Sequence, residues 1–108
     1  MSSYFFVQSL DPFVDRATDT QFSLMSELAA AGNEVSLFLV QNGVVSAASQ
    51  AVSPEFDKLL DAGIKIYADK FSLWQREIEL TQLKKHIESA ELHVVIQAMV
   101  NGEKVIWN

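Results

Sequence analysis

Three glycines in this sequence follow stretches of helical patterning and precede short β-rich stretches. Gly32 separates an alanine-rich run from the apolar run that begins at Val35, and Gly63 and Gly102 stand at equivalent junctions. Glycine adopts the left-handed backbone conformation that commonly ends a helix. Three helix–glycine–strand junctions in one short chain predict alternating helices and strands. Such alternation predicts a mainly parallel sheet covered by helices.

The hydrophobic pattern gives the approximate bounds of the elements. The expected strands are 4–9, 35–40, 64–67 and 104–107, with a further short strand or a turn at 82–87. The expected helices are 15–31, one that begins at Pro54, 71–79 and 90–101, with a shorter one within 44–52. The start at Pro54 is well marked, because Ser53 is a favoured N-cap and proline suits the first helical position.

Residues 90–101 carry two conflicting signals. The β-branched run from Val94 to Ile96 is typical of a strand. Apolar residues nevertheless recur with helical spacing, at Leu92, Val95, Ile96 and Met99. Ser89 can cap such a helix and Gly102 can end it, so we predict a helix here.

Composition narrows the classes of partner. Eight Lys and Arg against fourteen Asp and Glu give a net charge of −6, which repels nucleic-acid phosphates and anionic lipid headgroups. We therefore expect no nucleic-acid partner and no membrane partner. Only 20% of the residues are charged, while 49% are hydrophobic, which predicts apolar surface buried between subunits. At this length we expect residues 1–108 to form a single domain.

The chain contains no cysteine, which excludes disulfides, thiolate metal sites and thiol nucleophiles. This composition fits a reducing compartment. The N-terminal residues lack the basic region of a secretory signal, so we expect a cytoplasmic protein. His86 and His93 fall on different expected elements, and neither a phosphate-binding loop nor a nucleophile elbow is present. We expect no metal and no cofactor.

Four stretches along the chain together carry a resemblance to a known family. They are 9–13 at the end of the first strand, 31–44 with its glycine and apolar strand, 63–78, and 103–107. The second stretch is similar to a GHEV…FL…GV pattern. In the third stretch the expected strand is followed by an arginine, Arg76. In this order and spacing they resemble the DsrE/DsrF/DsrH family, which includes sulfur-relay proteins of the Tus type.

The resemblance implies a three-layer α/β/α fold around a mostly parallel sheet of about five strands. It also implies assembly as trimers, hexamers or hetero-hexamers of related subunits. In catalytic members a cysteine after the third strand carries a persulfide. Counting back from Arg76 in the family's spacing places that cysteine at Asp69. Because a carboxylate cannot hold a sulfane sulfur, we expect this chain to be non-catalytic.

Four polar residues are candidates for a ligand-binding rim at the carboxyl ends of the strands, where parallel sheets bind ligands. They are Asp11, Asn42, Asp69 and Arg76. For each one alone, turn and capping chemistry is the simpler explanation, and we expect Arg76 to pair with a carboxylate such as Asp69 or Glu77.

Two aromatic residues flank the loop around Asp69. Tyr67 and Trp74 could line a pocket or an interface between subunits, although core packing is the simpler expectation for both.

Two functions follow from these observations. The first is a non-catalytic DsrE-like subunit that binds or scaffolds in intracellular sulfur transfer, as a homo-oligomer or beside related subunits. The alternative is a small-molecule-binding protein or enzyme that uses the rim of Asp11, Asp69 and Arg76. A flat apolar surface near Trp74 favours the first function, and a closed pocket around Asp69 favours the alternative.

Overall fold

The computed structural model describes residues 2–108 and contains one five-stranded sheet. The strands are β1 (Ser3–Gln8), β2 (Glu34–Leu39), β3 (Lys65–Asp69), β4 (Ile87–Ala90) and β5 (Lys104–Trp107). Their order across the sheet is β4-β3-β2-β1-β5, and every neighbouring pair is parallel. The expected mostly parallel α/β sheet is therefore confirmed.

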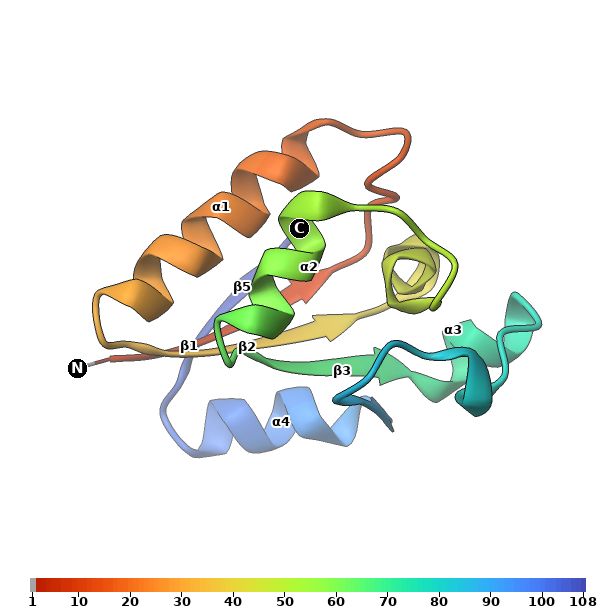
Figure 1. Cartoon of the computed structure of the whole chain (residues 1–108). Coiled ribbons are helices and arrows are strands. Elements are labelled where there is room, and N and C mark those ends of the chain that lie inside the picture. The colour runs from red at the N-terminus through yellow and green to blue at the C-terminus, as the bar shows by residue number, and fades with distance from the viewer. Residues whose placement is uncertain (1) are drawn as a thin grey trace.

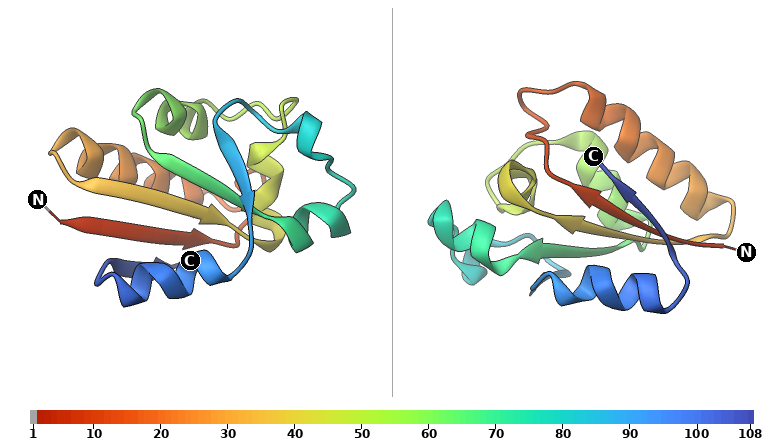
Figure 2. Two further views of the ribbon diagram at one scale, coloured as in Figure 1. Left: turned by 90° about the horizontal axis from the view of Figure 1, so that it is seen from below. Right: turned by 180° about the vertical axis from the view of Figure 1, so that it is seen from behind.

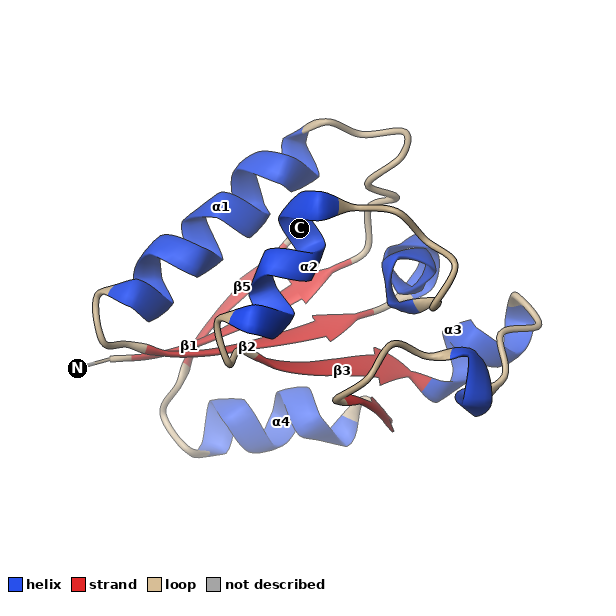
Figure 3. Ribbon diagram, in the orientation of Figure 1, coloured by secondary structure: helices blue, strands red, loops and turns tan. Residues whose placement is uncertain are grey.

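Helices cover both faces of the sheet, which gives three layers (Figure 1; Figure 3). On one face lie α1 (Ala17–Ala30), α2 (Pro54–Asp61) and the 3₁₀ helix η1 (Gln41–Ala47). On the other face lies α4 (His93–Val100). The short helix α3 (Lys70–Gln75) and the 3₁₀ helix η2 (Leu80–Gln82) extend beyond the carboxyl end of β3, as Figure 2 shows from two further sides.

The alternation of strand side chains divides the core in two. Phe6 of β1 is buried among residues of α1 and α2, such as Phe22 and Phe56. Its neighbours Phe5 and Val7 point to the opposite face and belong to the cluster that includes Val95 of α4. A central strand of a parallel sheet is buried on both faces, which explains the continuous apolar run of β1.

Most of the ambiguous stretch at 90–101 is helical, as predicted, and forms α4, but Ser89 and Ala90 belong to β4, so the predicted cap at Ser89 is wrong and the helix begins at His93. The reason is packing, because the helical spacing places Val95 and Ala98 against the sheet. The short strand expected at 82–87 lies later, since β4 covers Ile87–Ala90. His86 adopts a left-handed φ of 69°, and the chain turns there before Ile87 pairs with Ile66.

Two helical segments differ from the bounds predicted from the sequence. The helix expected at 71–79 ends at Gln75, because Glu77 has a left-handed φ of 55° that no α-helix can continue. The helix expected within 44–52 is instead η1, which includes the Asn42–Gly43 turn.

A Cβ at Gly43 would collide with the backbone carbonyl of Gln8, so glycine permits η1 to lie against the end of β1. This contact fixes Asn42 at the carboxyl edge of the sheet.

No helix within residues 2–108 is long and apolar enough to cross a membrane.

Candidate functional site

Asp69 is the last residue of β3 and the N-cap of α3. Its Oδ2 accepts hydrogen bonds from the backbone N–H of Ser72 at 3.0 Å and from the Ser72 hydroxyl at 2.7 Å. An N-cap carboxylate satisfies a backbone donor that the first turn of a helix leaves without an intrahelical partner. The position that the resemblance assigns to a sulfur carrier is therefore occupied by a structural acceptor.

Ser72 connects this cap to the neighbouring strand. Its buried hydroxyl donates to Asp69 and accepts a 2.7 Å hydrogen bond from the backbone N–H of Gln41, just beyond β2. Gln41 has a φ of 50°, a conformation that costs a non-glycine residue free energy and persists only where its surroundings impose it. The Ser72 hydroxyl is one such constraint, because it accepts from the Gln41 N–H in this conformation.

Arg76 and Asn42 complete the same cluster. The Arg76 guanidinium donates to Asn42 Oδ1 at 2.9 Å and to the Ser72 carbonyl at 3.2 Å. The expected ion pair of Arg76 with Asp69 or Glu77 is wrong: the ion pairs within residues 2–108 are Lys58–Glu55 and Lys84–Asp57. Asp69 accepts its hydrogen bonds from Ser72. Arg76 instead donates to the Ser72 carbonyl, because the carbonyls near the end of a helix have no intrahelical partner.

Asp11 lies apart from these contacts. Its Oδ1 accepts a 2.8 Å hydrogen bond from the Phe13 N–H in the loop after β1, which is an Asx turn. The hydrogen bonds that connect Asn42, Asp69 and Arg76 do not include Asp11. The four candidates thus separate into a cluster of three residues and one turn residue.

Tyr67 is half-buried on the face of the sheet that α4 covers. Its ring stacks on Phe5 with centroids 6.4 Å apart, and the Lys65 ammonium lies 5.6 Å from the ring centroid. The pKa of Lys65 is raised, mainly by the interaction of its ammonium with the Tyr67 side chain and further by the negative charge of Glu88. Tyr67 packs beside the core, in agreement with the simpler expectation.

Trp74 contradicts that expectation, because 74% of its surface is exposed. Its ring stacks on Phe71, which is itself exposed, with centroids 5.9 Å apart. On a six-residue helix that extends beyond the sheet, neither ring can reach the core. With Leu80, which is also exposed, they form an apolar surface that we call the α3 surface.

Two grooves border this region. The first has a volume of about 930 Å³ and is lined by Lys70, Leu73, Trp74, Gln75, Glu77, Ile78, Glu79 and Leu80. The second, of about 620 Å³, is lined by Phe38, Val40, Gln41, Asp69, Lys70, Phe71, Ser72, Gln75, Glu91, Leu92 and Trp107. The second groove lies at the carboxyl edge of the sheet and contains Asp69, whereas Arg76, Asn42 and Asp11 do not line it.

Sequence reasoning missed Ser72, Phe71 and Trp107. A signal for Ser72 existed, since a serine three residues after an N-cap aspartate can donate to the cap through both its backbone and its side chain. Phe71 and Trp107 carried no such signal, because the pattern does not reveal which apolar residues stay exposed.

The cluster has a limited chemistry. It holds one carboxylate, one guanidinium, one amide and one hydroxyl, and each has a hydrogen-bond partner within the protein. Within residues 2–108, no group of three or more His, Asp or Glu side chains could hold a metal ion. With no cysteine in the chain, nothing at this position can carry a persulfide.

The family model of the DsrE/DsrF-like family matches residues 2–107. No curated protein matches the sequence. Among solved structures, the ychN protein from E. coli has a TM-score of 0.89 at 16% identity, with 100% of both chains covered.

Two further structures have the same fold. The protein of unknown function MTH1491 from Methanobacterium thermoautotrophicum has a TM-score of 0.82 at 13% identity, covering 99% of this chain and 98% of that one. The conserved protein of unknown function BT1422 from Bacteroides thetaiotaomicron has a TM-score of 0.79 at 18% identity, with 99% and 95% covered.

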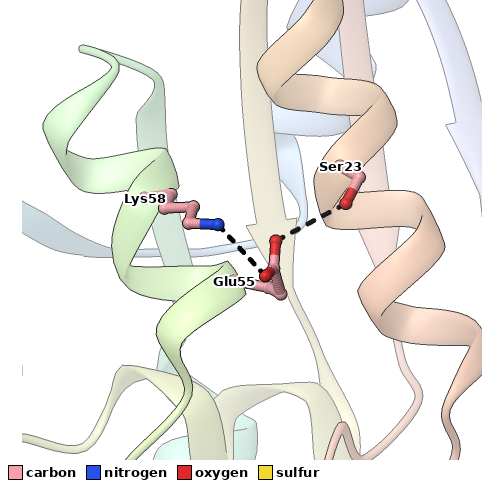
Figure 4. A network of polar contacts seen from close by, with 3 residues as sticks. All are labelled: Ser23, Glu55 and Lys58. Atoms are coloured by element: carbon pink, nitrogen blue, oxygen red, sulfur yellow. Dashed lines mark hydrogen bonds and ion pairs between the residues drawn. The ribbon is translucent and has the colours of Figure 1, made fainter.

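Ser72→Ala should lower the free energy of unfolding by about 1–3 kcal/mol, because the Gln41 N–H loses its acceptor and Asp69 loses one donor. Urea unfolding measures this change. The matched control is Ser23→Ala on α1, whose exposed hydroxyl makes one 3.5 Å contact to Glu55 (Figure 4). That control should change the free energy by less than about 0.5 kcal/mol. Equal effects of the two substitutions would contradict the role assigned to Ser72.

Proposed function

This chain belongs to the DsrE/DsrF-like family, and we propose that it is a non-catalytic binding or scaffolding subunit of intracellular sulfur transfer. It works in the cytoplasm as a single domain, in a homo-oligomer or beside related subunits that carry the cysteine. The observation that carries the proposal is the state of Asp69. The position that relatives use for a sulfur carrier is here a helix cap whose carboxylate is held by Ser72.

The α3 surface supports the binding part of this proposal. Phe71, Trp74 and Leu80 are each at least 60% exposed. Trp74 and Leu80 line the groove of about 930 Å³, and Phe71 lines the groove of about 620 Å³. Aromatic side chains are enriched in protein interfaces and often dominate their energetics. A cluster of two stacked aromatic rings and a leucine in water is costly, so a protein partner that buries it best explains this surface.

The position of the α3 surface supports a partner from the same pathway. Trp74 lies on the helix that Asp69 caps, so a partner bound there lies next to the position of the family's sulfur carrier. A subunit without a thiol can hold a cysteine-bearing partner in place without competing with it for sulfur.

Trp74→Asp should weaken binding to a cysteine-bearing DsrE-like partner at least tenfold, because it removes an aromatic anchor and adds a charge to an apolar contact. The chain and its bound proteins are isolated from the native host, and the intact assembly is weighed by mass spectrometry. Affinity is then measured by calorimetry with the purified partner. Glu79→Gln, at the rim of the same groove, is the control and should leave binding nearly unchanged. Two results together would contradict the proposal. The assemblies from the host would contain no other DsrE-like chain, and the purified chain would be a monomer.

Asp69→Cys should give a thiol that reacts with alkylating reagents several-fold faster than Ser23→Cys in the middle of α1. The Ser72 N–H and hydroxyl that now donate to Asp69 can stabilise a thiolate at the same place, which lowers the thiol pKa. The chain has no other cysteine, so the rates are read without background. The wild-type chain should take up no sulfane sulfur. A slower thiol at position 69 than at 23 would refute the correspondence with the family's carrier.

A second candidate function is small-molecule binding, and the groove of about 620 Å³ is the observation that favours it. Ligand pockets commonly have volumes of 300–1,000 Å³, with apolar walls and a few polar groups. Here Phe38, Phe71 and Trp107 supply aromatic walls, and Asp69 supplies a carboxylate. Arg76 and Asp11 do not line this groove, so the candidate rests on Asp69 and the aromatic walls instead of the acid–base rim expected from the sequence.

Binding in this groove should change the fluorescence of Trp107. Trp74→Phe leaves Trp107 as the only tryptophan, because the chain contains two. Small aromatic amines, chosen for the aromatic walls and the carboxylates of Asp69 and Glu91, are titrated into this variant. Saturable quenching that Asp69→Asn weakens supports the candidate. Quenching that is linear in concentration, or unaffected by Asp69→Asn, rejects it.

A further inference from the structure

The dipeptide Asn-Gly occurs twice in this chain, at Asn42–Gly43 and at Asn101–Gly102. Asparagine is one of the thermally labile residues of proteins. It is most labile before glycine, because glycine has no side chain to shield its backbone nitrogen or to restrict its movement. That nitrogen can attack the side-chain carbonyl carbon of the preceding asparagine. The structure holds the two dipeptides in different surroundings, so their reactivities should differ.

The reaction needs only the chain and water. A bond forms between the glycine nitrogen and Cγ of the asparagine, while the bond from Cγ to the side-chain nitrogen breaks. The proton of the glycine N–H leaves with that side-chain nitrogen as ammonia, and a five-membered succinimide ring remains. Water then opens the ring at one of its two carbonyl carbons. Opening at Cγ gives aspartate, and opening at the backbone carbonyl carbon gives isoaspartate, so the step involves no oxidation or reduction.

The first dipeptide is held on several sides. The side-chain oxygen of Asn42 accepts a 2.9 Å hydrogen bond from Arg76, and the Gly43 N–H donates to the Val40 carbonyl at 2.9 Å. Gly43 is buried within η1 and lies directly against the Gln8 carbonyl. The nitrogen of Gly43 therefore lacks the freedom and the space to turn toward Cγ of Asn42.

The second dipeptide lies at an exposed helix end. Asn101 is the C-cap of α4, and both it and Gly102 are exposed. Open space surrounds the position that a Cβ of Gly102 would take. The Gly102 N–H donates to the Met99 carbonyl at 3.1 Å, and the Asn101 side chain accepts a 3.2 Å hydrogen bond from the exposed Gln97. Helix ends open more easily than packed segments, and such opening frees the Gly102 nitrogen to attack.

We propose that Asn101 is a site of spontaneous deamidation in the folded protein, whereas the fold protects Asn42. The two sites share one dipeptide and one chain, so the difference between them is a property of the structure. This proposal concerns the end of α4 and does not depend on the function proposed above.

The modification weakens the junction between α4 and β5. An aspartate at position 101 places a negative charge at the C-terminal end of α4, where the helix dipole disfavours it. An isoaspartate adds a carbon atom to the backbone just before the Glu103 N–H, which donates to the Ala98 carbonyl at 3.0 Å. Lys104 pairs with Tyr4 at the next residue, so there is little chain in which to absorb the change. Figure 1 shows that α4 covers its face of the sheet alone, so its displacement would uncover that side of the core.

The first experiment follows both sites in the folded wild-type chain during several weeks at neutral pH. Trypsin separates them, because Lys58 and Lys85 lie between them. Mass spectrometry detects the gain of nearly one dalton at each site, a sample taken at the start corrects for deamidation during digestion, and an isoaspartate-specific methyltransferase identifies isoaspartate. The Asn101 peptide should convert about tenfold or more faster than the Asn42 peptide, since local opening is far easier at a helix end.

The unfolded chain is the control for this comparison. In guanidinium chloride the fold holds neither dipeptide, so the two sites should convert at comparable rates. Equal rates at the two sites in the folded chain would overturn the proposal. A difference of the same size in the unfolded chain would also overturn it, because neighbouring residues would then explain the difference without the fold.

The second experiment measures what the modification does to the structure. Asn101→Asp should unfold at a lower urea concentration than the wild type and should exchange the amide hydrogens of β5 faster. Asn101→Gln is the matched control, because it keeps the amide but would have to form a six-membered ring, which closes far more slowly. It should keep the wild-type stability and should not convert within the same weeks. If Asn101→Asp were as stable as Asn101→Gln, the effect assigned to the α4–β5 junction would be wrong.

Discussion

The hydroxyl of Ser72 is the interaction on which the carboxyl edge of this protein depends. It joins the end of β3, through Asp69, to Gln41, which lies two residues after the end of β2 and donates its backbone N–H. Arg76 then extends the connection to Asn42, because its guanidinium binds both the Ser72 carbonyl and the Asn42 side chain. Each of these side chains therefore has a hydrogen-bond partner within the protein. This cluster holds the ends of β2 and β3 together, which supports the binding or scaffolding role proposed for this chain.

The fold could be predicted because its local signals agree with its global arrangement. The glycines after the helices all adopt the expected positive φ, at Gly32, Gly63 and Gly102. The helical spacing of apolar residues was the correct signal for α4, although its sequence contains a β-branched run. In the helix, Val95 and Ala98 both pack into the core on the α4 side of the sheet. The position of β4 could not be predicted, since it depends on pairing with β3 and only its ends, Ile87 and Ala90, are buried. A strand that short carries too little periodicity to mark its own bounds.

Three of the four residues predicted for the candidate site lie in one hydrogen-bonded cluster, but the sequence predicted neither the contacts between them nor the central role of Ser72. Asn42, Asp69 and Arg76 do meet, because parallel strands end at one edge. Pairing by charge gave the wrong partner for Arg76, because the open carbonyl of Ser72 and the amide of Asn42 were closer than any free carboxylate. The exposure of Trp74 was also unpredictable, since it follows from α3 ending at Gln75 and extending beyond the sheet. Sequence reasoning locates groups along the chain, whereas partners and exposure are decided by the packing of distant segments.

The groove of about 620 Å³ adjoins the α3 surface, because Phe71 lines it together with Asp69. Under the proposed function, a subunit bound to the α3 surface would narrow the opening of this groove and exclude water from its aromatic walls. An interaction with the Asp69 carboxylate would then be stronger than in the isolated chain, because the local dielectric constant falls. The two proposed functions would therefore be compatible, because the contacts that hold a partner on the α3 surface would also help to enclose the groove.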